Sequence, residues 1–62
     1  MKDFKLKFVT TFCYETGETG KKIFVAEDYA DAFFQFEQFK DEELDGKVEL
    51  LEIEEIGVVL KN

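Results

Sequence analysis

The sequence predicts a small α+β domain in which one helix packs on one face of a small antiparallel sheet. Two patterns carry this prediction: apolar residues that alternate near the ends of the chain, and helically spaced apolar residues between them. We expect the elements in the order ββαβ, or ββαββ if the last segment forms two strands. Residues 1–62 are expected to make a single α+β domain, because a chain of this length has room for one core.

The first predicted strand covers residues 4–14. Apolar and aromatic side chains dominate its even positions, which are Phe4, Leu6, Phe8, Thr10, Phe12 and Tyr14. The odd positions are more polar and carry Lys5, Lys7, Val9, Thr11 and Cys13. Because successive strand residues point to opposite faces, this alternation predicts a half-buried strand whose even face meets the core. Gly17 and Gly20 favour a turn, so residues 21–26 are expected to complete a hairpin with a loop of about four to six residues.

The middle of the chain predicts a helix that begins after Asp28. Asp28 can cap the first turn, and Asp31 makes an imperfect capping box in which Asp replaces the usual Glu. At ~100° per residue, one arc of the helix contains Tyr29, Ala32, Phe33, Phe36 and Phe39. We expect this stripe to face the sheet and the helix to stop near Gly46.

The last segment, residues 47–60, changes the phase of its apolar residues twice. They fall on even positions at 48 and 50, on odd positions at 51 and 53, and on even positions again at 56, 58 and 60. Each change predicts a bulge or bend, and Gly57 suits one of them. The segment is therefore either one long bent strand or two short strands.

The arrangement of the sheet follows from the lengths of these strands and from the crossover rule. The first strand is expected in the middle, antiparallel to both the second strand and the last. The helix then covers one face, and the other face lacks a layer over its side chains Val9, Thr11, Cys13 and Phe24. A small core and an uncovered, partly apolar face predict a homodimer that forms through this face or through an exposed strand edge.

Composition excludes several classes of function. The chain contains 15 Asp and Glu against 8 Lys, carries a formal net charge of −7, and has no His, Arg or Ser. The missing residue types supply most catalytic bases, phosphate clamps and metal ligands, so we expect no enzyme activity, no cofactor and no metal site. The negative charge disfavours direct binding to nucleic acid or to a membrane. A lone cysteine, Cys13, indicates a reducing cytoplasm.

Two features are candidate determinants for binding a protein partner. Phe34 lies opposite the apolar stripe, among acidic and amide side chains, where a correctly packed helix exposes it as an aromatic anchor. The alternative is a rotated helix, or contact with the last strand, that buries Phe34. The second feature is an acidic run in which Asp41, Glu42 and Asp45 are candidate contact residues. This run either keeps the domain solvated or imitates nucleic-acid phosphates toward a basic groove.

Two short motifs have functional alternatives. The ligand spacing of an EF-hand calcium loop is matched by Asp41, Glu43, Asp45, Gly46 and Glu52, so the segment resembles such a loop. Leu44 stands where glycine is common and the following segment is a poor helix, so we expect no specific calcium site. Residues 15–18 read Glu-Thr-Gly-Glu, which resembles the degron of a vertebrate stress-response transcription factor and is also favourable turn chemistry.

A short acidic ββαβ chain without arginine or catalytic groups resembles the small accessory proteins carried by phages and mobile elements of low-GC Gram-positive bacteria. Proteins of that kind often bind and inhibit a host factor, such as a defence nuclease, a repair enzyme or RNA polymerase. The resemblance implies a protein-binding module that acts as a stoichiometric inhibitor or modulator in the host cytoplasm. A structural protein that assembles only with itself is the second hypothesis, and a calcium-binding module is the third.

Overall fold

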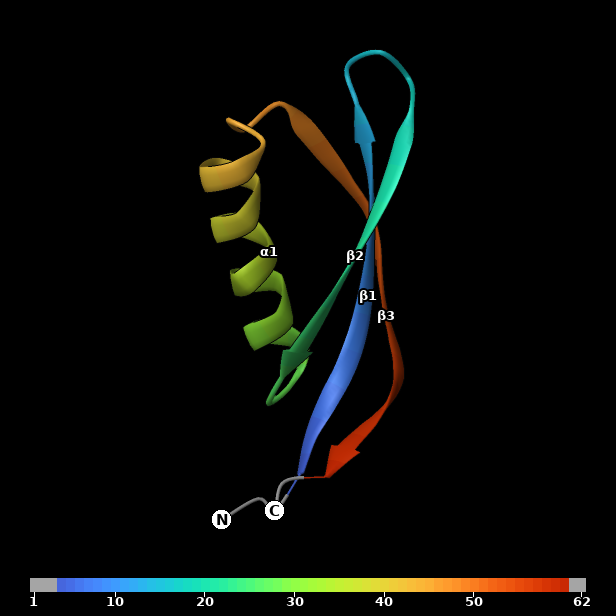
Figure 1. Cartoon of the computed structure of the whole chain (residues 1–62), viewed down its shortest axis with the longest axis vertical. Coiled ribbons are helices and arrows are strands. Elements are labelled where there is room, and N and C mark those ends of the chain that lie inside the picture. Colours follow the sequence, from blue (N-terminus) through green and yellow to red (C-terminus); the bar gives the residue numbers. More distant parts are fainter. Residues whose placement is uncertain (1–3, 61–62) are drawn as a thin grey trace.

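The computed structural model describes residues 4–60 and confirms the predicted ββαβ order (Figure 1). Its elements are β1 (Phe4–Tyr14), β2 (Thr19–Ala26), α1 (Tyr29–Glu43) and β3 (Val48–Leu60). A three-stranded antiparallel sheet with one helix on one face makes the expected α+β architecture. Residues 1–3 and 61–62 of the predicted domain lie outside the described residues.

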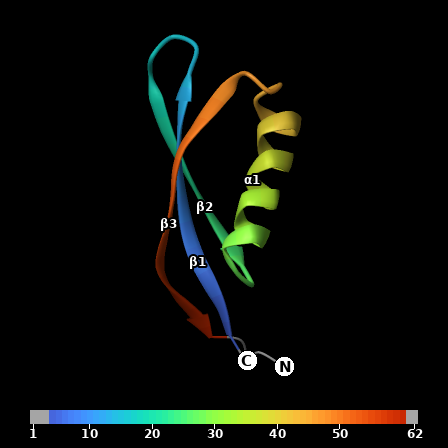
Figure 2. The same cartoon turned by 180° about the vertical axis from the view of Figure 1, so that it is seen from behind.

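β1 lies in the middle of the sheet, as predicted, with β2 and β3 antiparallel on either side (Figure 2). β3 is one strand of 13 residues, so the two-strand alternative is wrong. Its register against β1 skips Leu51 and Ile56, which marks two bulges. Each bulge lies where the apolar residues of the sequence shift between even and odd positions. The extra residue in the bulge compensates for that shift, so apolar residues before and after it face the core.

The core lies between α1 and the even-numbered face of β1. One buried cluster contains Phe8, Ala26 and Ala32, with Leu6 and Ile53 packed against it. The other contains Phe12, Phe36 and Val48, with Phe24, Phe39, Leu44 and Leu50 packed against it. Thr10, between the two clusters in β1, is fully buried and its hydroxyl donates a hydrogen bond of 2.9 Å to the Lys22 carbonyl. This bond satisfies a polar group that burial would otherwise penalise.

Both ends of α1 are capped as the sequence predicts. The Asp28 carboxylate accepts a 2.9 Å hydrogen bond from the Asp31 backbone N–H, and the Asp31 carboxylate accepts one of 3.0 Å from the Glu27 backbone N–H. A shorter Asp therefore closes the start of the helix from the position that Glu occupies in a capping box. At the other end Gly46, with φ of 71°, donates its N–H to the Lys40 carbonyl at 2.9 Å. Glycine adopts this left-handed conformation without a steric penalty.

The structure corrects three placements. Phe24 lies on the covered face, because it pairs directly with Phe8 and its ring centroid is 6.0 Å from that of Phe39. β2 begins at Thr19 rather than Lys21, and the resulting hairpin register decides which of its side chains face α1. Two aromatic residues of the predicted stripe lie at its margins, Tyr29 at 57% exposed and Phe33 at 43% exposed. The helix therefore buries a narrower stripe than the arc of apolar residues suggests.

Candidate functional site

Phe34 is the most exposed aromatic side chain of residues 4–60, at 62%. Two positions later on α1, Phe36 is fully buried against the sheet. Residues two apart on a helix differ by about 200° in direction, so Phe34 points away from the sheet. The predicted exposure is confirmed, and the alternatives of a rotated helix or of burial under the last strand are wrong.

The structure separates the four residues that were predicted to contact a partner. Asp41 is exposed seven positions after Phe34, which places both on the same side of α1. Glu42 lines a groove between α1 and β2. Asp45 is exposed in the turn after α1, where its φ is 57°. Phe34 and Asp41 therefore share one surface, while Glu42 and Asp45 belong to two others.

The groove beside Glu42 has a volume of about 420 Å³. Phe24 and Phe39 line it, and the Lys22 ammonium lies 5.2 Å from the centroid of the Phe39 ring. The Gln35 side-chain amide, which also lines the groove, donates a 3.0 Å hydrogen bond to a β2 carbonyl and so ties the helix to the strand. Sequence reasoning missed this groove because it exists only when the hairpin register brings Phe24 beneath α1.

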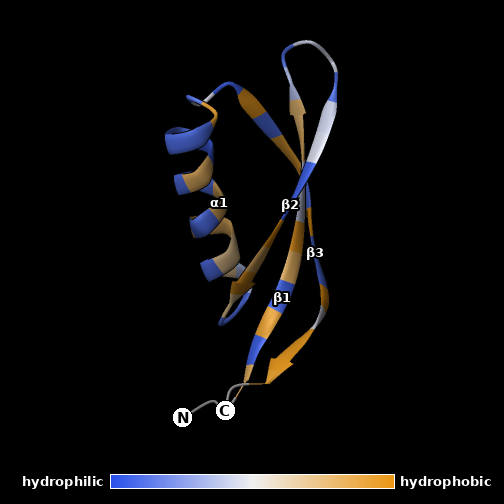
Figure 3. Cartoon of the chain, viewed as in Figure 1, coloured by the Kyte–Doolittle hydropathy of each residue, from blue (hydrophilic) through white to orange (hydrophobic). Residues whose placement is uncertain are grey.

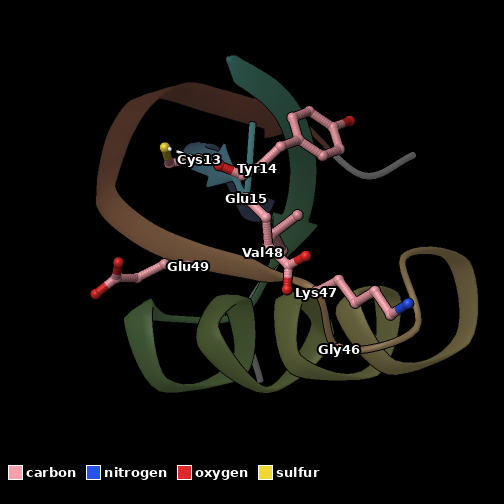
Figure 4. Close-up of a pocket in the computed structure, with 7 residues that line it drawn as sticks. All are labelled: Cys13, Tyr14, Glu15, Gly46, Lys47, Val48 and Glu49. Atoms are coloured by element: carbon pink, nitrogen blue, oxygen red, sulfur yellow. Dashed lines mark hydrogen bonds between the residues drawn. The ribbon is translucent and has the colours of Figure 1, made fainter. Parts of the chain in front are cut away.

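A second hollow of about 250 Å³ lies between the end of β1 and the start of β3 (Figure 4). Cys13 lines it, and its thiol donates a 3.3 Å hydrogen bond to the neighbouring Tyr14 carbonyl. In the close-up, the side chains of Cys13 and Glu49 lie on one side, while those of Tyr14 and Lys47 extend to the other. Because these polar groups do not converge on one point, the hollow does not assemble a reaction centre.

The face of the sheet that lacks a helix has mixed charge. Its apolar residues include Ile23 and Val25, which are 54% and 40% exposed. Its lysines are Lys5, Lys7 and Lys21, and its carboxylates are those of Glu49, Glu52 and Glu54. The eight carboxylates between Asp41 and Glu55 are thus divided among the end of α1, the turn after it, and both faces of β3, where Glu55 pairs with Phe8 on the covered face. They do not make one continuous row.

The residues that resemble a calcium loop do not form an EF-hand. An EF-hand needs a helix after its loop, whereas this chain continues as β3, in which Glu52 pairs with Thr11. Among residues 4–60, no group of three or more acidic or cysteine side chains is placed to hold a metal ion. The same part of the chain has no helix long and apolar enough to cross a membrane.

No protein-family model, curated protein or solved structure shows a significant match to this chain. Function is therefore inferred from the surface of the domain alone. Two surfaces stand out: the side of α1 around Phe34, and the end of β3, where Val58 and Leu60 are 55% and 78% exposed.

Proposed function

We propose that the chain is a small protein-binding module that contacts its partner through the side of α1 that faces solvent. The members of this outer face recur at spacings of three and four residues: Ala30, Phe34, Glu37 and Asp41. Gln38 lies at the border between this face and the groove beside Glu42. The exposure of Phe34, 62%, is the observation that supports the proposal. An aromatic side chain within a polar rim is typical of an interface anchor, and the carboxylates favour a partner whose apolar pocket is bordered by Lys or Arg.

The size of the exposed ring is sufficient for such an anchor. With ~200 Å² for a fully exposed phenylalanine, a partner that buries the rest of Phe34 removes about 120 Å² of apolar surface from water. At about 25 cal/mol per Å² this burial stabilises the complex by about 3 kcal/mol. Residues that contribute more than about 2 kcal/mol dominate interfaces. The exposed carboxylates contribute less affinity, because water and salt screen them, and more to the rate of association.

The proposed role is that of a stoichiometric inhibitor or modulator of a cytoplasmic host protein. Nucleic-acid-handling and defence enzymes are the first candidates, because a net charge of −7 complements the basic surfaces of such proteins. A structural protein that assembles only with itself is the alternative. The exposed apolar end of β3 favours self-association, and the two roles are compatible because they use different surfaces.

The test compares partner recovery by three forms of the tagged protein in lysate of the source cell: wild type, Phe34→Ala and Tyr29→Ala. Tyr29 is the matched control, because it is an exposed aromatic residue of the same helix but lies beside the sheet, with its ring centroid 6.3 Å from that of Phe8. We expect wild type and Tyr29→Ala to retain one protein in a stoichiometric ratio. Phe34→Ala is expected to bind that protein at least about 30-fold more weakly, which corresponds to ~2 kcal/mol.

Two outcomes would contradict this proposal in different ways. Equal binding by Phe34→Ala would show that the outer face of α1 is not the contact surface. Recovery of no foreign protein by any of the three forms would contradict the protein-binding function itself.

Charge reversal distinguishes an aromatic anchor from an imitation of nucleic-acid phosphates. In the doubly substituted form Glu42→Lys, Asp45→Lys, a phosphate-mimicking surface would lose affinity steeply and show a strong dependence on salt. An interface anchored by Phe34 would change mainly in its association rate. Measuring both rates at two ionic strengths separates these cases, and the anchored behaviour is the expected one.

A further inference from the structure

The sheet extends beyond the helix at the end where β1 begins and β3 finishes (Figures 1 and 3). There Phe4 pairs with Leu60 and Leu6 pairs with Val58, on the same face of the sheet as the buried Phe8. The exposed fractions of Phe4, Val58 and Leu60 are 38%, 55% and 78%. Figure 3 shows this end of β3 as strongly apolar. The core face therefore continues into an apolar surface that α1 does not cover.

The same end of β3 is an unprotected sheet edge. β3 pairs with β1 on one side, and no other described strand pairs with its second side. Natural sheets block such edges with charges and bulges. Residues 48–55 of β3 carry four Glu, and the strand bulges at Leu51 and again at Ile56. Residues 56–60 read Ile-Gly-Val-Val-Leu and contain no charge. The protection by charges therefore ends at Glu55 and the protection by bulges at Ile56, which leaves residues 57–60 as the open part of the edge.

The other surfaces of the domain are less suited to self-association. Along the edge of β2, Lys21 and Lys22 would bring like charges together, and the Val25 carbonyl already accepts a hydrogen bond from Gln35. Stacking two copies through the uncovered face would bury its lysines and carboxylates, which carries a desolvation cost. Residues 23–26 of β2 are also uncharged, but this stretch is shorter and its Val25 carbonyl is already bonded to Gln35. For two chains that each carry −7, residues 56–60 are therefore the longer stretch of edge where identical strands meet without like charges facing each other.

We propose that this end of β3 is the contact surface of a homodimer, in which residues 56–60 of two copies pair as antiparallel strands. A two-fold axis at Val58 places Ile56 of each copy opposite Leu60 of the other. The pairing satisfies backbone groups on both edges and joins the exposed apolar rows of the two core faces. The result is a continuous six-stranded sheet that carries both helices on the same face.

Sedimentation equilibrium in physiological salt tests the dimer with wild type, Val58→Lys and a matched control, Ile23→Lys. Ile23 is 54% exposed on the β2 edge, against 55% for Val58, so the same substitution is made at equal exposure on the opposite edge. We expect wild type and Ile23→Lys to form dimers at high micromolar concentration. Val58→Lys is expected to raise the dissociation constant of the dimer at least about tenfold, because it opposes two like charges at the axis. Leu60→Lys, at a still more exposed position, should have the same effect if Val58→Lys fails to fold.

Several results would overturn the proposal. These are a wild-type protein that stays monomeric, a dimer disrupted by Ile23→Lys, and a dimer that survives both Val58→Lys and Leu60→Lys. The salt dependence of the dissociation constant is an independent test. The proposed contact is uncharged while the two acidic chains repel each other, so added salt should screen this repulsion and strengthen the dimer. A dimer that weakens as salt is added would indicate lysine–carboxylate contacts, and would also overturn it.

Discussion

Phe36 and Phe34 lie two residues apart in α1 and provide a paired test of the core. Phe36 is fully buried, and its ring centroid lies 5.8 Å from that of Phe12, 6.2 Å from that of Phe39 and 6.5 Å from that of Phe24. Phe36→Ala therefore removes the ring that joins α1 to β1 and β2, and leaves a cavity among three other rings. Phe34→Ala removes a ring that mostly contacts water.

The expected magnitudes differ enough to be measured. Truncating a buried phenylalanine costs about 3–5 kcal/mol, whereas a domain of this size has a free energy of unfolding of about 3–9 kcal/mol. Phe36→Ala should thus lower the melting temperature by at least ~12 °C, at ~4 °C or more per kcal/mol, or prevent folding. Phe34→Ala should change stability by less than about 1 kcal/mol, because the lost contacts are few and alanine favours the helix.

Thermal and urea denaturation followed by far-UV circular dichroism measure these changes. Phe33→Ala supplies an intermediate point, because Phe33 is 43% exposed. With ~200 Å² for the whole side chain, about 115 Å² of it is buried, so the expected cost is about 2–3 kcal/mol. The order of destabilisation should be Phe36, then Phe33, then Phe34. Equal losses for Phe34→Ala and Phe36→Ala would refute the rotation of α1 described here, and with it the role of Phe34 as an anchor.

Three further predictions concern local packing, helix capping and metal binding. Gly20→Ala should destabilise the domain by about 1–3 kcal/mol in urea denaturation, because the added Cβ would lie 2.8 Å from a Phe12 ring carbon. The control Gly57→Ala should be nearly neutral, because no described atom lies within 4 Å of its added Cβ. Equal losses of stability in the two variants would contradict a steric clash with Phe12. Asp28→Ala should cost about 1 kcal/mol by removing the acceptor of the Asp31 N–H, while Asp28→Asn should retain most of the stability. Calcium titrated by calorimetry should give no saturable isotherm, and one-to-one binding tighter than about 10 µM would show that a specific site exists.

Features that depend on neighbours in the sequence were predictable from the sequence. The bounds of β1 follow from its alternation, because each residue of a strand takes its face from its position alone. The start of α1 follows from Asp28 and Asp31, which are close enough in the chain to cap one turn. The two bulges of β3 follow from the phase changes beside Leu51 and Ile56. The direction of Phe34 follows from helical geometry once the buried stripe is known.

Features that depend on how the elements meet were decided only by the tertiary structure. Phe24 was predicted on the wrong face, because a shift of one residue in hairpin register moves every side chain of a strand to the opposite side. Phe33 is half exposed, because the width of the buried stripe depends on how closely α1 approaches the sheet. Asp41 and Glu42 are adjacent in sequence yet belong to different surfaces, because successive helical residues differ by about 100° in direction and β2 lies on one side of α1 only. Local chemistry selects the elements, and long-range packing then determines which of their side chains reach solvent.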